Sequence, residues 1–292
     1  MIIKNIFSKH IPETILLFTI FLSFLLFFSG QSSPAGSITS ADGPLKLPII
    51  MYHEIKTYKL GKDVISPYEF ESDLKYLKDN GYNTITMSQL IDYVYYGAAL
   101  PEKPVILSFD DGYLNTYNYA YPLLKKYDME VVLSIIGKNT DDFTKIPDSN
   151  PDYSHATWAQ LYDMFYSGCA EIQNHTYNMH SITSKRVGCM QANSESLEEY
   201  EKVLTDDILK LQNEVFSITG MLPNTFAYPY GGYNDNTDAI LKKIGFKATL
   251  TCDYGINLIT HDPEILFDLK RICRSHGDTI ENILKEALKT IR

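Results

Sequence analysis

The sequence lacks an excess of basic residues. Its 26 Lys and Arg side chains stand against 36 Asp and Glu side chains, which gives a formal net charge of −10 at pH 7. A protein that binds nucleic acid needs a basic face for the phosphates. The charge balance therefore argues against a nucleic-acid partner, and like-charge repulsion argues against an anionic polymer. A neutral or cationic partner is compatible with it.

Cysteine is scarce as well. The chain has four, at Cys169, Cys189, Cys252 and Cys273, and no C-x-x-C pair. The missing pair argues against a zinc site made of thiolates. An even number permits disulfides in an exported chain. Because Cys169, Cys252 and Cys273 lie in apolar, strand-like surroundings, we favour buried free thiols.

The longest hydrophobic run is short. Residues 15–28 carry no charge and follow Lys4 and Lys9, but they fall short of the ~20 residues that a membrane-spanning helix needs. A basic start, a short apolar core and a small polar stretch are typical of a secretory signal. We therefore expect residues 1–30 to be a signal peptide or an N-terminal membrane anchor. Either one places the rest of the chain outside the cytoplasm, with membrane contact only through this segment.

The remainder has the composition and pattern of one globular domain. Hydrophobic residues make up 45% and charged residues 21% of the chain. Residues 31–45, rich in Ser, Gly, Ala and Pro, are expected to be a linker to a domain at residues 46–292. Helical patterns alternate there with expected strands at residues 47–52, 83–86, 104–109, 131–136, 170–173, 225–228, 246–251 and 267–273. This alternation predicts an α/β fold with parallel strands, a (β/α) barrel of seven or eight units. Residues 137–155 are expected to form a polar loop over the barrel mouth.

Two adjacent carboxylates stand at one expected strand end. Asp110 and Asp111 follow the apolar residues 104–109 and precede Gly112. In (β/α) barrels, polar residues at the carboxyl ends of strands build the active site. Neighbouring strand residues point to opposite sides, so both carboxylates face the barrel mouth only if the chain turns there, which a glycine permits. The structural alternative is an Asp that caps a helix.

Two histidines follow another expected strand end. His175 comes directly after residues 170–174, and His180 comes five positions later. That spacing places them about 140° apart on a helix, so they converge only if residues 176–179 form a loop. With a nearby carboxylate they make a His-His-Asp set suited to Zn²⁺, with Ni²⁺ or Co²⁺ as alternatives. Three protein ligands leave positions open for water and substrate.

A metal beside a base and an acid can hydrolyse an acyl group. One Asp binds the metal, its neighbour accepts a proton from water, and the attacked group is a carbonyl. His53, at the end of the first expected strand, can protonate the leaving group near neutral pH. Simple packing at the strand end is the alternative for His53.

These residues resemble the polysaccharide deacetylases related to the nodulation-type chitooligosaccharide deacetylase, which form carbohydrate esterase family four. The stretch SFDDG at residues 108–112 is similar to the first motif of that family, usually TFDDG, and the histidine pair is similar to the second. The resemblance implies a distorted (β/α)7–8 barrel of this type. It also implies that Asp110 is the catalytic base and that Asp111, His175 and His180 bind one divalent metal ion.

A histidine spacing of five resembles the branch that contains exported poly-β-1,6-N-acetylglucosamine deacetylases. In that branch an early strand-end histidine, here His53, is thought to be the general acid. The branch also has an aromatic-Pro-Tyr-Gly stretch. Here that stretch contains Tyr228, Pro229 and Tyr230, the candidate substrate-binding residues.

The chain departs from the family pattern in two places. The Arg that usually steadies the catalytic Asp is replaced by Ala227, and Arg271 or Arg274 is a candidate substitute. The late histidine motif of the family matches only loosely, at His276. We therefore assign the general acid to His53 rather than to His276.

The resemblance implies a metal-dependent hydrolase that removes N-acetyl groups from a cell-surface or extracellular polysaccharide. Poly-N-acetylglucosamine, peptidoglycan and chitin-like polymers are the candidate substrates. An O-acetyl esterase of the xylan type would use the same residues, and a catalytically decayed glycan-binding protein is a further alternative. A glycosidase fits less well, because Asp110 and Asp111 are adjacent and cannot easily flank a glycosidic bond.

Overall fold

The computed structural model describes residues 43–291, which belong to one compact unit, Asp42–Arg292. The expectations for residues 1–30, and for most of the linker at 31–45, concern residues outside this part. Among residues 43–291, no helix combines the length and the apolar character needed to cross a membrane.

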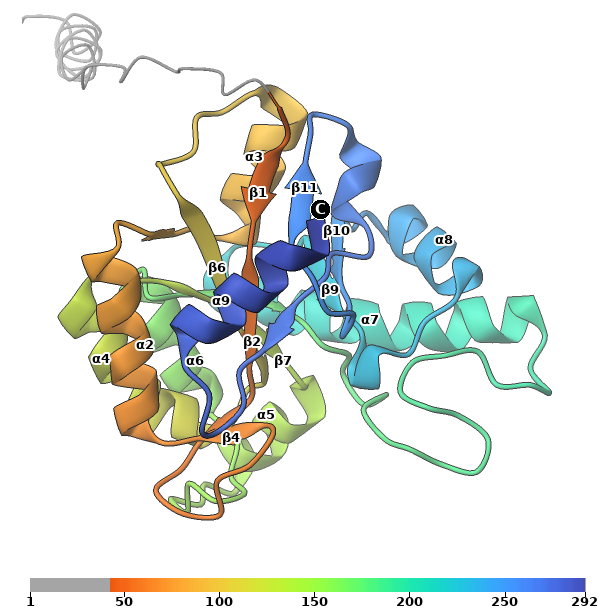
Figure 1. The fold of residues 1–292 in the computed structure, drawn as a ribbon. Helices are drawn as coiled ribbons and strands as arrows, with labels where there is room; N and C mark the ends of the chain where they lie inside the picture. The colour runs from red at the N-terminus through yellow and green to blue at the C-terminus, as the bar shows by residue number, and fades with distance from the viewer. Residues whose placement is uncertain (1–42, 292) are drawn as a thin grey trace, which may run out of the picture. The chain divides into compact units, whose positions relative to one another are not determined.

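A sheet of parallel strands forms the centre of the fold (Figure 1). Its strands are β2 (Ile49–Tyr52), β5 (Asn83–Thr84), β6 (Pro104–Asp111), β7 (Val131–Ile135), β8 (Ala170–Asn174), β9 (Thr225–Ala227), β10 (Ala248–Leu250) and β12 (Ile272–Cys273). The order across the sheet is β10-β9-β8-β7-β6-β2-β12, and β5 also pairs with β6. All residues of β6 are buried, as expected for a parallel strand with both faces covered.

Residues 269–273 join the two edges of this sheet. Leu269 forms a parallel bridge with Leu250 of β10, and Ile272 of β12 pairs with Ile50 of β2. The sheet therefore curls into a distorted barrel, as the sequence predicts. The distortion is visible between β8 and β9, which share a single residue pair, Asn174 with Phe226.

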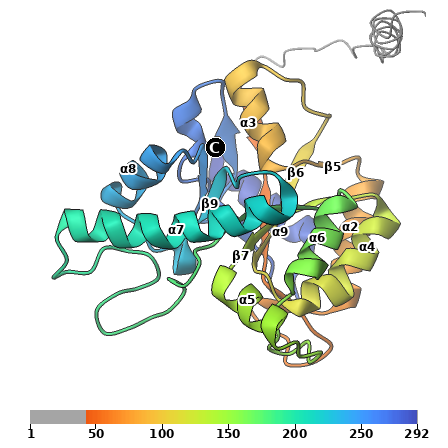
Figure 2. The same cartoon turned by 180° about the vertical axis from the view of Figure 1, so that it is seen from behind.

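Helices surround the barrel (Figures 1 and 2). They are α2 (Pro67–Asp79), α3 (Met87–Tyr96), α4 (Tyr121–Tyr127), α5 (Gly137–Lys145), α6 (Trp158–Tyr166), α7 (Leu197–Thr219), α8 (Asp235–Ile244) and α9 (Ile280–Leu288). Hydrogen bonds from nearby side chains fix where several of these helices begin. Ser66 and Glu69 form a reciprocal capping box at the start of α2, and Thr157 caps α6 in the same way with Gln160.

Small elements complete the barrel ends. Strand β1 (Leu45–Leu47) pairs with β11 (Asn257–Ile259), and β3 (Glu54–Ile55) pairs with β4 (Val64–Ile65). Short helical turns are η1 (Thr116–Ala120), η2 (Pro229–Gly231), η3 (Pro263–Leu266) and η4 (Lys289–Ile291). The strand expected at residues 267–273 is reduced to β12 and the bridge at Leu269.

One part of the expected loop at residues 137–155 is a helix, so that prediction was wrong for α5. Only Gly137 and Thr140 of this helix are buried, and neither is apolar. The helix therefore leaves no hydrophobic period in the sequence. A Cβ atom at Gly137 would lie 2.7 Å from the Tyr177 ring, so the start of α5 needs a glycine.

The four cysteines are free thiols, as expected. Cys169 and Cys189 are buried, whereas Cys252 is exposed and Cys273 is partly exposed. The expectation of burial was therefore wrong for Cys252 and Cys273. Cys252 lies beyond the end of β10, where the chain has left the sheet.

Candidate metal centre

Strand β6 ends in the two adjacent carboxylates, and the backbone turns there. Asp111 has φ 73° and Gly112 has φ 76°, a left-handed conformation that is uncommon for a residue other than glycine. Asp110 pairs with Arg271, while Asp111 faces two histidines. The turn therefore gives the two carboxylates different partners at one barrel end.

Asp111, His175 and His180 come together at this end. Each offers one ligand atom, and these atoms lie within 4.8 Å of one another. The Nε2 atoms of His175 and His180 are 3.5 Å and 3.2 Å from Asp111 Oδ1. The histidines converge because the chain after β8 is not helical: Thr176 has φ 73°, and its N–H donates to the Asn174 side chain.

The donor atoms fit a divalent cation. His175 Nδ1 donates to the Ala227 carbonyl at 2.7 Å, which leaves the Nε2 lone pair facing the site. Burial lowers the pKa of His175 to about 3, so the ring is neutral, as metal ligation requires. Asp111 Oδ1 is buried, and no group among residues 43–291 donates a hydrogen bond to it. Burial raises the pKa of Asp111 to about 7, and a cation would remove that penalty.

Asp110 is held by a buried arginine. Arg271 Nη1 donates to Asp110 Oδ1 at 2.8 Å, and Arg271 Nε donates to the Thr251 carbonyl at 2.7 Å. Burial by itself would raise the pKa of Asp110, but the charge of Arg271 and its hydrogen bond, together with the neighbouring histidines, hold that pKa well below its usual range. Arg274 pairs instead with Asp73, at 2.8 Å and 3.1 Å. Of the two candidate arginines, Arg271 is therefore the one that contacts Asp110.

His53 lies directly after β2, beside this pair of carboxylates. Its Nδ1 atom is buried and finds no hydrogen-bond partner among the residues that the structure describes. A positive charge on His53 would oppose the effect of burial, which raises the pKa of both Asp110 and Asp111, so His53 lies within electrostatic reach of the two carboxylates. His276 has a different setting: its Nδ1 is 3.0 Å from Glu69 at the start of α2.

The predicted substrate-binding stretch divides into two parts. Tyr228 and Pro229 are buried, and the Tyr228 ring stacks on Tyr233 with centroids 4.4 Å apart. The prediction that these two contact substrate does not fit their burial: Tyr228 packs in the core, and Pro229 is buried at the start of η2. Tyr230 is 47% exposed, and its ring lies 4.5 Å from that of His180. It is the member of the stretch that a substrate can reach.

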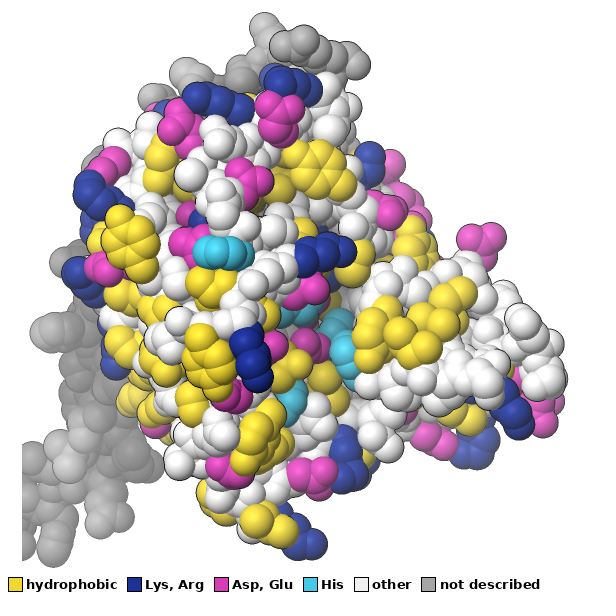
Figure 3. Space-filling model, turned by 60° about the horizontal axis from the view of Figure 1, so that its bottom comes forward, with side chains coloured by type: hydrophobic (Ala, Val, Ile, Leu, Met, Phe, Trp, Pro, Cys, Tyr) yellow, Lys and Arg dark blue, Asp and Glu magenta, His cyan; other side chains and the backbone are white. Residues whose placement is uncertain are grey.

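Sequence reasoning did not single out His155, which lies against Asp111. Its Nδ1 donates to the Asp111 carbonyl at 3.0 Å, and burial lowers its pKa to about 4. His155 belongs to no recognisable motif, so the sequence around it does not indicate a place in the site. Figure 3 shows histidine and acidic side chains gathered in a hollow on this face.

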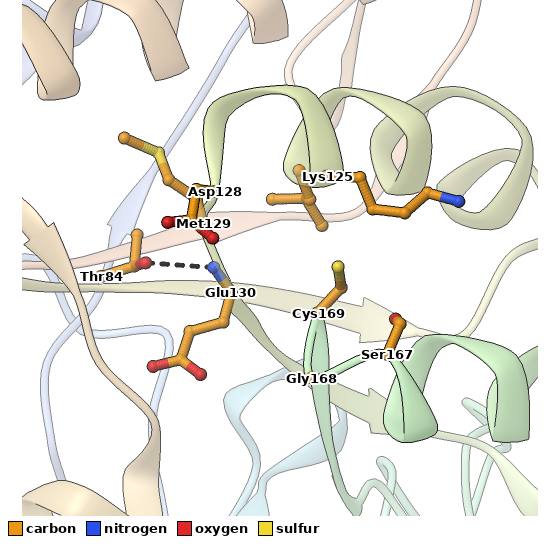
Figure 4. Close-up of a pocket in the computed structure, with 9 residues that line it drawn as sticks. Thr84, Lys125, Asp128, Met129, Glu130, Ser167, Gly168 and Cys169 are labelled. Carbon is orange, nitrogen blue, oxygen red and sulfur yellow. Dashed lines mark hydrogen bonds between the residues drawn. The ribbon is translucent and has the colours of Figure 1, made fainter.

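A cavity of about 310 Å³ lies elsewhere (Figure 4). Met129 and Glu130 line it just before β7, and Cys169 lines it just before β8. These are the amino ends of the strands. The cavity therefore opens at the barrel end opposite to Asp110 and Asp111, and it has no part in the candidate metal centre.

Comparisons with known proteins agree with this geometry. The profile of the family described as Polysaccharide deacetylase matches residues 97–249. The chain is 32% identical over 216 residues to the Bacillus subtilis protein YxkH, named as a polysaccharide deacetylase, covering 73% of this chain and 66% of that protein. It is 29% identical over 210 residues to the poly-β-1,6-N-acetyl-D-glucosamine N-deacetylase of Staphylococcus aureus strain MRSA252, covering 70% of this chain and 63% of that enzyme.

Among solved structures, a de-N-acetylase from Aggregatibacter actinomycetemcomitans superposes with a TM-score of 0.71 at 28% identity, covering 82% of this chain and 99% of that chain. The chain belongs to the polysaccharide deacetylase family. The predicted family and fold class are thereby confirmed. The relatives named as N-deacetylases are hydrolases of amide bonds, the enzyme class that the sequence predicts.

Proposed function

We propose that the protein removes N-acetyl groups from N-acetylglucosamine units of a cell-surface or extracellular polysaccharide. The observation that carries this proposal is the convergence of Asp111, His175 and His180 within 4.8 Å beside an Asp110 that Arg271 keeps ionised. Two carboxylates with separate partners permit separate roles, one as a metal ligand and one as a base.

The residues divide the chemistry between them. Asp111, His175 and His180 would hold a divalent ion, which would supply Lewis acidity toward the acetyl carbonyl and toward water. Ionised Asp110 accepts the proton of the attacking water, and Arg271 fixes its direction. His53 then donates a proton to the departing sugar nitrogen, so that it leaves as an amine rather than as an amide anion.

The exposed ring of Tyr230 supports a sugar substrate. It lies against His180 and next to the ligand set, where its face can pack on the apolar side of a pyranose ring. The Staphylococcus aureus relative is named for poly-β-1,6-N-acetyl-D-glucosamine, so we take this polymer as the first substrate to test. Peptidoglycan and chitin-like polymers follow.

We also propose that the reaction takes place outside the cytoplasm. The support is the pattern of basic, apolar and small polar residues over positions 1–30. Fractionation of cells, with protease added from outside, tests the placement. A chain found only in the cytosolic fraction would overturn this part of the proposal and leave the chemistry untouched.

The decisive experiment measures acetate release by the full chain from β-1,6-linked and β-1,4-linked N-acetylglucosamine oligomers. Each substrate is assayed with added Zn²⁺, Ni²⁺ or Co²⁺ and with a chelator. Release that the chelator stops supports a metal-dependent N-deacetylase, and the preferred linkage selects the polymer. Acetate released only from O-acetylated xylan would establish the esterase instead. A metal-loaded chain that releases none from any substrate would favour a glycan-binding protein.

A further inference from the structure

His155 is tied to the metal-ligand turn by its ring and by its backbone. Its Nδ1 donates to the carbonyl of Asp111 at 3.0 Å. Its backbone forms an antiparallel bridge with Tyr113, flanked by hydrogen bonds from Ala156 N to Gly112 O and from Leu114 N to Ser154 O. Residues 154–156 are therefore hydrogen-bonded through their backbone to the chain segment that follows β6.

The ring of His155 has a fixed orientation. A carbonyl only accepts hydrogen bonds, so Nδ1 carries the proton, and Nε2 accepts from the Asn139 side-chain amide at 3.0 Å. The ring also stacks on Tyr113, with centroids 4.5 Å apart and planes 25° from parallel. His155 is 93% buried (relative exposure 7%). Two hydrogen bonds and one stacking contact leave the imidazole no second arrangement.

The turn at Asp111 needs such support. Asp111 adopts φ 73° although it has a side chain, and backbone conformations of this kind persist only where the surrounding structure enforces them. The same turn sets the direction of the carboxylate that meets His175 and His180. A hydrogen bond to the Asp111 carbonyl therefore acts on the position of a ligand atom without touching that atom.

We propose that His155 is a positioning residue for the reaction: it holds the backbone turn that aims the Asp111 carboxylate at the other two ligands. This rests on the proposed function, since it assigns the residue to the same metal centre. Asn139 supports His155 from the side away from Asp111, because its hydrogen bond to Nε2 fixes the tautomer of His155. Helix α5, which carries Asn139, thus has a role beyond covering the barrel.

The test uses the metal-free full chain and Co²⁺ as a probe, because the d–d absorption of Co²⁺ reports both affinity and ligand geometry. His155→Ala removes the hydrogen bond and the stacking contact, whereas His155→Gln keeps an amide donor for the Asp111 carbonyl. The matched control is His261→Ala. His261 also uses Nδ1 on a backbone carbonyl, that of Tyr93 at 3.1 Å, and packs on the Tyr93 ring with centroids 4.7 Å apart.

We expect His155→Ala to weaken Co²⁺ binding about 10–100-fold, the usual effect of removing a residue that orients a metal ligand. Its absorption band should also change. With the metal saturating, kcat should fall while KM stays near the wild-type value. His155→Gln should recover part of the affinity, and His261→Ala should match the wild type in every measurement.

An unchanged Co²⁺ affinity and spectrum in a folded His155→Ala chain would overturn the proposal. If circular dichroism shows that this variant does not fold, His155→Gln and Asn139→Leu test the proposal instead. Weaker binding with an altered band in either supports the proposal, and wild-type values in both overturn it. A wild-type chain that binds Co²⁺ but releases no acetate would refute the proposed function alone, because the effect of His155 on affinity would still be measured.

Discussion

Replacing Arg271 with methionine tests whether the buried ion pair controls the ionisation of Asp110, the carboxylate that we propose as the base. Arg271 is 1% exposed and Asp110 is 2% exposed, and their atoms are 2.8 Å apart. Removing one partner of a buried pair leaves an uncompensated charge and costs about 3–5 kcal/mol. For a domain of this size, each kcal/mol shifts Tm by about 2–4 °C. We therefore expect Arg271→Met to lower Tm by roughly 6–20 °C.

The same change should reverse the pH dependence of stability. In the wild type the folded pKa of Asp110 is depressed, so its contribution is present above the unfolded pKa of about 3.9 and is lost as the pH falls toward the folded value. Without Arg271, burial raises the folded pKa above 3.9. The free energy of unfolding of the variant should then be reduced least below about pH 4, and it should fall as the pH rises through the new pKa.

Urea unfolding between pH 3 and pH 8, together with pH–rate profiles of acetate release, measures both effects. Arg274→Met is the matched control, because Arg274 forms the other buried pair, with Asp73. It should lose comparable stability but keep the wild-type shape of the pH–rate profile. The double change Arg271→Met with Asp110→Asn should regain part of the lost stability. An Arg271→Met chain with wild-type stability and pH profile would refute the assignment of Arg271.

Further predictions concern the metal, the acid, the sugar contact and the thiols. A chelator should abolish acetate release without changing the circular dichroism, and added Zn²⁺ should restore it. His53→Ala should lower kcat by about 10²–10⁴-fold, whereas His276→Ala should stay within about twofold of wild type, because His276 is engaged by Glu69. Tyr230→Ala should raise KM by about 2–10-fold, from the 0.5–1.5 kcal/mol of an aromatic contact, with Tyr230→Phe near wild type. A thiol reagent should modify Cys252 and Cys273 first in the native chain and all four cysteines after unfolding.

The sequence predicts the parallel barrel and the strand ends that carry the site, because both leave periodic or adjacent signals. The pairing of Arg271 with Asp110 could not be predicted over that of Arg274. The two arginines flank the same short strand, Arg271 directly before β12 and Arg274 directly after it, and the choice depends on the register of β12 on β2. His155 escaped notice because its contact is with a backbone carbonyl, which no side-chain pattern reveals. The burial of Tyr228 depends on the packing of Tyr233.

The segment at residues 269–273 joins both edges of the sheet and also carries Arg271. Asp110 and Arg271 are 161 positions apart in the sequence, so the carboxylate that we propose as the base gains its ion pair only when one of the last segments of the chain is inserted. A chain whose earlier strands have folded but whose final strand has not would hold an unpaired Asp110 and would be inactive. During refolding, acetate release should therefore recover only when the last strand has been inserted and the barrel is complete.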